Sequence, residues 1–412
     1  MPHDTDLIAA IAVGLSAAFV GGMIAFRLRL PQIVGYLLAG MVVGPFTPGF
    51  VADGEIASQL AEIGVILLMF GVGIHFSIGD LLAVRRLALP GAVGQVAIAS
   101  SLGIGIALVW GWTFGEGLVF GLALSVASTV VLLRALTLYG KLDMPAGSVA
   151  VGWLVVEDLI TVVALVLLPA LVIPLGGTDP SGATEGNLVV DLAWTFGKVA
   201  LFVVLMLVGG IRLIPWLLTR VERTGNRELF ILATLATALG IAFGAAELFG
   251  ASFALGAFLA GVVVNESELS HRAAEEALPL RDAFSVLFFV SVGMLIDPSS
   301  LIDNLDRLIP VVLVVMIGKA VAAVLLVRLL GGPVRVGLTV AAGLSQIGEF
   351  SFILADVGTS LDLLPDEGRE LILAAALVSI TLNPLLFQLI GPLAARFGEE
   401  ATVAPAAPAS AS

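Results

Sequence analysis

The sequence contains no cysteine and few charged residues. Without cysteine, the chain can form no disulfide bond, thiolate metal site or cysteine nucleophile. Charged residues make up only 12% of its 412 residues, whereas soluble globular proteins carry roughly 25%. So few charges cannot cover a water-facing surface of this size, so the composition excludes a soluble enzyme.

The chain has long apolar runs instead, and 59% of its residues are hydrophobic. The runs are continuous, whereas the strands of a membrane barrel would alternate, so they predict spanning helices and make the lipid bilayer a partner. The formal net charge of -13 argues against nucleic acid as a partner. We therefore expect an all-α integral membrane protein.

Thirteen apolar runs are long enough to be helices, and the second and ninth are short for a span. The predicted runs are 7–26, 32–46, 57–76, 90–111, 116–137, 146–174, 189–219, 228–249, 251–265, 280–297, 308–331, 335–357 and 369–394. The loops between them are mostly short, which predicts a transmembrane domain over residues 1–395. Residues 396–412, rich in Ala, Pro and Ser toward the end, are expected to be a disordered cytoplasmic tail.

The basic residues predict the orientation of these spans. If the N-terminus lies outside, most of the 19 lysines and arginines fall on the cytoplasmic side. That distribution follows the positive-inside rule and agrees with an odd number of spans. We expect the N-terminus outside, the C-terminus in the cytoplasm, and a location in a bacterial-type inner membrane.

An internal repeat is visible in the second and ninth runs. The segment GYLLAGMVVG at 35–44 aligns with GAFLAGVVVN at 256–265, and six of the ten positions are identical at an offset of 221 residues. The two runs cross the membrane in opposite directions, which predicts an inverted repeat of six helices, a linker helix and six helices. Secondary transporters are built in this way, with their site near the bilayer midplane at broken helices.

Three charged residues lie in the middle of predicted spans: Glu157, Asp158 and Lys319. A charge at the bilayer centre costs roughly 2.5–3.5 kcal/mol on insertion scales, so each is a functional candidate. Lys319 is about 17 Å from either end of its run at the helical rise, too far for its stem to reach water. It therefore needs a partner inside the protein.

Adjacent helical residues point about 100° apart, so Glu157 and Asp158 cannot share one face. We expect Asp158 to face an aqueous cavity and to bind a monovalent cation or a proton. We expect Glu157 to form a buried pair with Lys319. Two alternatives remain open: a static ion pair that only locks helices together, and Glu157 as a second proton-binding residue.

Two of the runs contain small and polar residues at membrane depth, which permits unwound backbone. One holds Ser128 and Thr129, and the other holds Gln346 and Glu349. Free carbonyls and half-helix dipoles at such a break can bind an ion or balance a charge. Tight helix packing by small residues explains Ser128 and Thr129 equally well, and Glu349 could serve only to cap a half-helix.

Several motifs resemble the Kef branch of the cation:proton antiporter-2 family. They are VGYLLAG at 34–40 with Gly44-Pro45 after it, FALGAFLAG at 253–261, FFVSVGM at 288–294 and QIGEF at 346–350. The resemblance runs from about residue 10 to 395. It implies a sodium/proton-antiporter-like fold, in which a core domain with two crossing broken helices moves against a dimerisation domain. It also implies a homodimer, with Asp158 as the ion-binding aspartate, Glu157 before it and Lys319 as the partner of Glu157.

The chain departs from the family in two ways. Kef systems proper carry glutamine where this chain has Glu157, which bears on stoichiometry and on potassium preference. Kef chains also continue into a nucleotide-binding regulatory domain, and these 412 residues contain no Gly-rich strand-turn-helix fingerprint. Regulation by nucleotide or glutathione is therefore not carried over.

The sequence thus predicts a secondary transporter, not an enzyme, that needs no cofactor and exchanges a monovalent cation for protons. Potassium efflux is the first expectation, with sodium as the alternative cation. A gated potassium channel is an alternative of another class, distinguished by flux without strict coupling to protons. An intramembrane aspartyl protease would need two facing aspartates on separate helices, and the sequence offers no evident pair.

Overall fold

The computed structural model describes residues 6–28, 30–47, 54–75, 78–142, 144–177, 197–251 and 253–396. Regular structure within these ranges is helical throughout, without a strand. The expected tail lies outside the described residues, apart from Arg396. The helices are α1 (Asp6–Arg27), α2 (Gln32–Val43), α3 (Gly54–His75), α4 (Ile78–Val109), α5 (Phe114–Ser125), α6 (Thr129–Leu138), α7 (Pro145–Leu167), α8 (Val172–Leu175), α10 (Ile211–Glu222), α11 (Arg227–Phe249), α12 (Phe253–Asn265), α13 (Ser270–Met294), α14 (Pro298–Asp303), α15 (Leu305–Leu313), α16 (Lys319–Leu329), α17 (Val334–Leu344), α18 (Glu349–Ser360) and α19 (Asp366–Arg396).

Among the described residues, nine continuous helices are long and apolar enough to cross a membrane, or ten when the bent pair α17 and α18 is included as one span. Three shorter apolar helices, α2, α5 and α12, add to these. Two helices begin earlier than their apolar runs: α4 at Ile78 instead of residue 90, and α13 at Ser270 instead of residue 280. A helix continues into polar sequence once it leaves the bilayer, which an apolar run cannot reveal.

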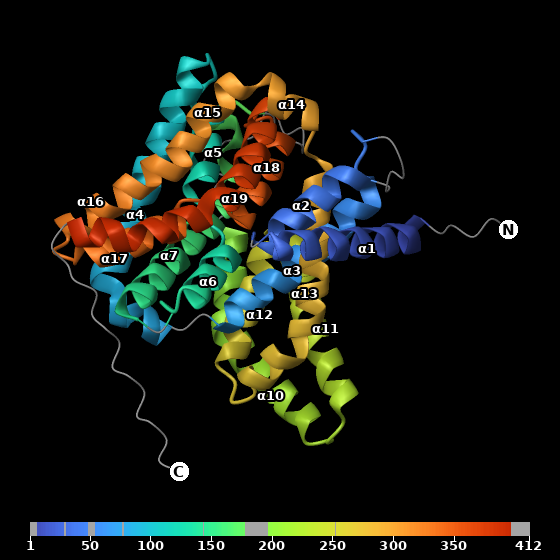
Figure 1. Cartoon of the computed structure of the whole chain (residues 1–412). Coiled ribbons are helices and arrows are strands. Elements are labelled where there is room, and N and C mark those ends of the chain that lie inside the picture. The colour runs from blue at the N-terminus through green and yellow to red at the C-terminus, as the bar shows by residue number, and fades with distance from the viewer. Residues whose placement is uncertain are drawn as a thin grey trace, which may run out of the picture.

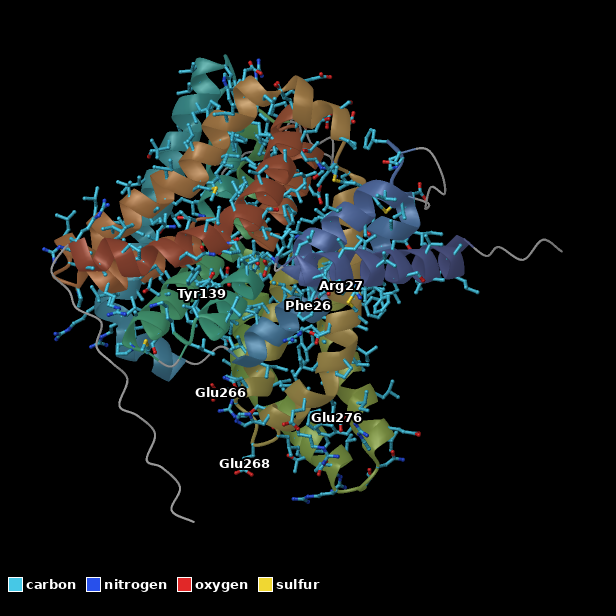
Figure 2. The ribbon with its side chains drawn as sticks, viewed as in Figure 1. Phe26, Arg27, Tyr139, Glu266, Glu268 and Glu276 are labelled. Atoms are coloured by element: carbon cyan, nitrogen blue, oxygen red, sulfur yellow. The ribbon has the colours of Figure 1, made fainter. Side chains whose placement is uncertain are left out.

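Ion pairs support the polar start of α13. Glu276 binds Arg227 at the start of α11 with an oxygen–nitrogen distance of 2.7 Å, and Arg272 pairs with Glu222 at the end of α10. Figure 2 shows Glu276 with Glu266 and Glu268 at the end of the molecule formed by these helices. Such exposed pairs contribute little to stability, about 0–1 kcal/mol each. The pairs lie at one end of these helices, beyond the apolar segments that cross the membrane.

The helices form two bundles (Figure 1). In the first, α3 packs against α12 and α13, α1 packs on α2, and α10 and α11 complete the group. In the second, α4 contacts α5, α7 and α16, while α17 and α18 contact α19. The main links between the bundles are α2 with α19 and α7 with α12. Each bundle therefore makes most of its helix contacts within itself.

Glycines allow the closest helix contacts in the first bundle. A methyl group on Gly40 of α2 would overlap the carbonyl oxygen of Val290 on α13, beside Gly293. A methyl group on Gly73 of α3 would likewise overlap the carbonyl oxygen of Phe258 on α12. Small residues let membrane helices approach this closely, and their van der Waals packing then holds the helices together.

Candidate ion-binding site

Two helices of the second bundle are interrupted in mid-course. The first stops at Ser125 and resumes at Thr129, with Val126 and Ser128 in extended conformations between α5 and α6. The second stops at Leu344 and resumes at Glu349, and its halves α17 and α18 are bent by 50°. The Ser128 hydroxyl caps the new helix by accepting from the Val131 amide at 3.3 Å. Both interruptions fall at the residues that the sequence suggested.

The two interruptions cross and bond to each other. The Gly348 amide donates to the Val126 carbonyl at 3.2 Å. The side chain of Gln346 pairs with Ser128 twice, accepting from its amide at 3.0 Å and donating to its carbonyl at 3.1 Å. A methyl group on Gly348 would overlap the carbonyl oxygen of Ala127, so only glycine fits the crossing. Backbone groups freed by unwinding thus find partners inside the protein, as the bilayer requires.

Asp158, on α7, lies against this crossing. Its Oδ2 accepts from the Thr129 hydroxyl at 3.0 Å, at the start of α6. Its other oxygen, Oδ1, has no hydrogen-bond partner among the described residues, and the residue is only 4% exposed. A buried carboxylate oxygen without a partner is costly unless something binds it. The N-terminus of α6 beside it carries a positive partial charge that favours the carboxylate.

Glu157, the preceding residue, is held by different groups. Its Oε1 accepts from Gln95 Nε2 of α4 at 2.8 Å and from Trp153 Nε1 at 3.1 Å. Trp153 lies one turn earlier on α7 and therefore on the same face. The backbone of Ala127 at the crossing also lies close enough to stabilise the charge of this carboxylate. The two adjacent acids thus face different surroundings, as their 100° separation requires.

Lys319 is buried, as is Glu157, and the two charges act on each other electrostatically. The Nζ of Lys319 donates to the Gln346 carbonyl at 3.1 Å, and it forms no ion pair with Glu157 among the described residues. The expected pair is therefore an electrostatic coupling without a direct contact. The physical reason is that α17 ends at Leu344, which leaves carbonyls at the negative end of a half-helix, and the ammonium binds there. Glu157 still acts electrostatically on Lys319 from a greater distance.

Glu349 completes the set of charges at the crossing. It is the first residue of α18, where a carboxylate complements the positive end of the helix. It is 1% exposed and is the charged group that acts most strongly on Asp158. Three acids, Glu157, Asp158 and Glu349, and one lysine, Lys319, are therefore buried around the crossing. When all are ionised, this set has an excess of negative charge that a cation or a proton can neutralise.

Comparison with known proteins agrees with this geometry. The family model for the transmembrane part of sodium/hydrogen exchangers matches residues 14–390. The chain belongs to the sodium/hydrogen exchanger family. It is 56% identical over 390 residues to YbaL of Escherichia coli (strain K12), which is named as a candidate cation/proton antiporter, and it covers 69% of that protein. It is 33% identical to K(+) efflux antiporter 4 of Arabidopsis thaliana, covering 94% of this chain and 64% of that one.

The fold also matches a solved exchanger structure. The sodium proton antiporter MjNhaP1 from Methanocaldococcus jannaschii superposes with a TM-score of 0.70 at 18% identity, over 96% of this chain and all of that one. These matches confirm the Kef-like membrane domain of the cation:proton antiporter-2 family that the motifs suggested. The chain is a multi-pass membrane protein of a cation/proton antiporter family.

As a candidate cation site of this exchanger family, the crossing offers oxygens of a carboxylate and a hydroxyl. The described residues contain no group of three or more His, Asp or Glu placed to hold a metal ion. The oxygens that the structure places together are the carboxylate of Asp158 and the hydroxyl of Thr129. Such oxygens suit a hard cation of low charge, whereas a divalent ion prefers several carboxylates.

Sequence reasoning missed several polar residues that support the crossing of this exchanger. Gln95 orients Glu157 from α4. On α19, Ser379 accepts from the Ile347 amide at 3.2 Å, and Asn383 Nδ2 donates to the Ala342 carbonyl at 2.7 Å. All three are at most 1% exposed. A signal was available in each case, because an amide or hydroxyl in the middle of an apolar run needs a partner inside the protein.

Proposed function

We propose that this chain exchanges a monovalent cation, most readily potassium, for protons by alternating access. Asp158 binds the cation and the proton in turn. The observation that carries the proposal is the unpartnered Oδ1 of Asp158, buried where two broken helices cross. A bound cation satisfies this oxygen in one state and a proton neutralises it in the other, so the site is never left as an uncompensated buried charge.

Potassium is preferred over sodium because of the relatives' names. The Arabidopsis relative is named a K(+) efflux antiporter, and its similarity extends over 94% of this chain. The structural neighbour is named a sodium proton antiporter, but at 18% identity it supports the fold alone. Sodium therefore remains the alternative cation, and a gated potassium channel the alternative of another class.

Proton flux in proteoliposomes tests the proposal. The purified protein is reconstituted with a pH-sensitive dye inside, and potassium or sodium is added outside at equal ionic strength. We expect proton movement with potassium, saturation at high potassium, and a fixed ratio of ions exchanged. Equal exchange rates with potassium and with sodium would refute the preference for potassium. Potassium flux without proton movement would favour the channel.

The contacts of the first bundle support the inverted repeat. Gly40 and Gly261 occupy equivalent positions in the two aligned segments, 221 residues apart. Gly40 packs against Gly293, and Gly261 packs against Gly73, so the same contact is made once by each half. A two-fold relation between the halves requires this reciprocity. We propose thirteen crossings, counting α2, α12 and the interrupted pair α5 and α6 with the ten longer spans.

The remaining parts of the proposal concern placement and assembly. The basic residues favour an N-terminus outside and a C-terminus inside, in a bacterial-type inner membrane, with residues 1–395 as one transport domain. The family resemblance supports a homodimer in which the second bundle moves against the first. Because the chain has no cysteine, single introduced cysteines report both sidedness and dimer contacts directly.

Cation and proton should compete for Asp158. Below the pKa of the site, the apparent Michaelis constant for potassium should rise about tenfold for each unit by which the pH falls, because a bound proton removes the charge that attracts the cation. Above that pKa the constant should be flat. The measurement is the initial exchange rate against potassium concentration, at equal pH on both sides. A constant independent of pH over the whole range would exclude a shared site.

A further inference from the structure

A large cavity lies between the two bundles, on the side where α3 begins and α18 ends. Its volume is about 860 Å³, room for on the order of 30 water molecules at about 30 Å³ each. Helices α3 and α13 of the first bundle form one wall, and α18 of the second bundle forms the other. In the orientation proposed above, this cavity opens to the outside. It can hold a hydrated cation.

One face of α18 leads from the mouth of this cavity toward the crossing. Ser360, Asp356, Ile353 and Glu349 are spaced by three or four residues, so they follow one another along the same face. Ser360 and Asp356 are exposed, Ile353 is half-buried, and Glu349 is 1% exposed. The first three line the cavity, and Glu349 lies one turn beyond Ile353, about 6 Å along the helix axis.

Three apolar residues form the inner end of the cavity. Val65, Phe288 and Ile353 are the lining residues farthest from the mouth on α3, α13 and α18 respectively. Phe288 also packs against Phe352 of α18, with ring centroids 6.3 Å apart. The cavity and Glu349 are thus separated by a single apolar layer.

Glu349 is poised to bind an ion at this layer. Neither of its carboxylate oxygens makes a hydrogen bond of ordinary geometry, although the Ser128 hydroxyl, the Thr129 amide and its own amide lie close and act on the carboxylate. Asp356, farther out on the same face, is instead neutralised by Arg369 at 2.8 Å. Following α18 inward from the mouth, Glu349 is therefore the first carboxylate on this face without an ion-pair partner, and Asp158 is its neighbour.

We propose that Glu349 is a second ion-binding residue, which receives the cation from the outer cavity past Ile353 and passes it to Asp158. The proposal rests on the exchange and the orientation put forward above. Capping of α18 explains an acid at this position, but it does not explain why that acid lies one turn behind the floor of a cavity and beside a second buried acid, Asp158.

Thiol labelling tests the route without depending on transport. In this cysteine-free chain, Ser360→Cys and Ile353→Cys should react with a membrane-impermeant reagent added outside, the first faster than the second. Glu349→Cys should react only when Ile353→Ala removes part of the apolar layer. Leu354→Cys is the matched control, since this buried residue of α18 does not line the cavity. Labelling of Glu349→Cys from the inside alone would overturn the outer route.

Exchange measurements test the role of Glu349. Glu349→Gln should raise the Michaelis constant for outside potassium by about tenfold or more, since it removes a charged contact to the ion. Glu349→Asp should stay within about threefold of the wild type, because it keeps the charge. Thermal unfolding should be unchanged in both variants. A purely structural capping role would lower the unfolding temperature of Glu349→Gln and leave the Michaelis constant unchanged, and that result would refute the proposal.

The two proposals fail in different ways. If the wild type exchanges ions and Asp158→Asn does not, while Glu349→Gln keeps the wild-type constant, only the role of Glu349 is wrong. If the wild type shows no coupled exchange, the proposed function fails, and the labelling still decides whether the route reaches Glu349.

Discussion

Replacing Asp158 by Asn should reduce cation/proton exchange to the level of protein-free liposomes while leaving the protein folded. The Asn side chain keeps the size of Asp158 and can still accept from the Thr129 hydroxyl. It cannot titrate, and it offers no charge to a cation. Removing a buried charge relieves a desolvation cost, so the unfolding temperature should stay the same or rise. Dye-monitored proton flux and thermal unfolding in detergent provide the two measurements.

The matched control for this variant is Asp366→Asn. Asp366 is an exposed acid in the first turn of α19, away from the crossing, so the same chemical change there should leave exchange unaltered. Exchange at the wild-type rate in Asp158→Asn vesicles would remove Asp158 from the mechanism, and Glu157 and Glu349 would become the acids to test.

Lys319→Ala should have the largest effect on stability. The change leaves the Gln346 carbonyl without its ammonium donor and leaves Glu157 without the cation that offsets its charge. Breaking such a buried arrangement costs about 3–5 kcal/mol. Arg328→Ala is the control on the same helix, because Arg328 is exposed near its end and its loss should cost little. Thermal unfolding in detergent measures both variants.

A double-mutant cycle with Glu157→Gln then measures the coupling between the two charges. We expect the double variant to recover part of the loss, with a coupling of about 0.5–3 kcal/mol. Recovery should be incomplete, because the Gln346 carbonyl still lacks its donor. If the two losses simply add, Lys319 serves the half-helix alone. Glu157 is then free to carry a second proton, and the exchange moves net charge.

Interrupted helices at Ser128, Thr129, Gln346 and Glu349 are one of two interpretations of the sequence, because small and polar residues at membrane depth permit unwound backbone but also pack well in continuous helices. The way the two interruptions bond could not be anticipated from the sequence. Gln346 reaches the backbone of Ser128 through its side-chain amide, although 218 residues separate them in the chain. Such a contact depends on where two helices that are distant in the sequence cross, and the order of residues within either helix does not predict it.

The partner of Lys319 shows the same limit. Distance from water correctly required a partner inside the protein, and Glu157 was the nearest opposite charge to suggest. The structure assigns Lys319 to the carbonyl end of α17, and gives the oxygen of Glu157 to Gln95 and Trp153. The carbonyl end of a half-helix carries a negative partial charge that attracts an ammonium, but it exists only once the chain has unwound at that depth.

From its sequence alone, this chain is determined to be a helical membrane protein with buried acids in the middle of its spans, because hydrophobicity and charge follow from residue types and their order. Tertiary structure alone decided that Asp158 meets Thr129 and Glu349 where two broken helices cross, and that a cavity ends one turn away at Ile353. These relations join residues on separate helices. The spacing of residues along one chain determines which side chains share a helix face, but the packing of helices determines which faces meet.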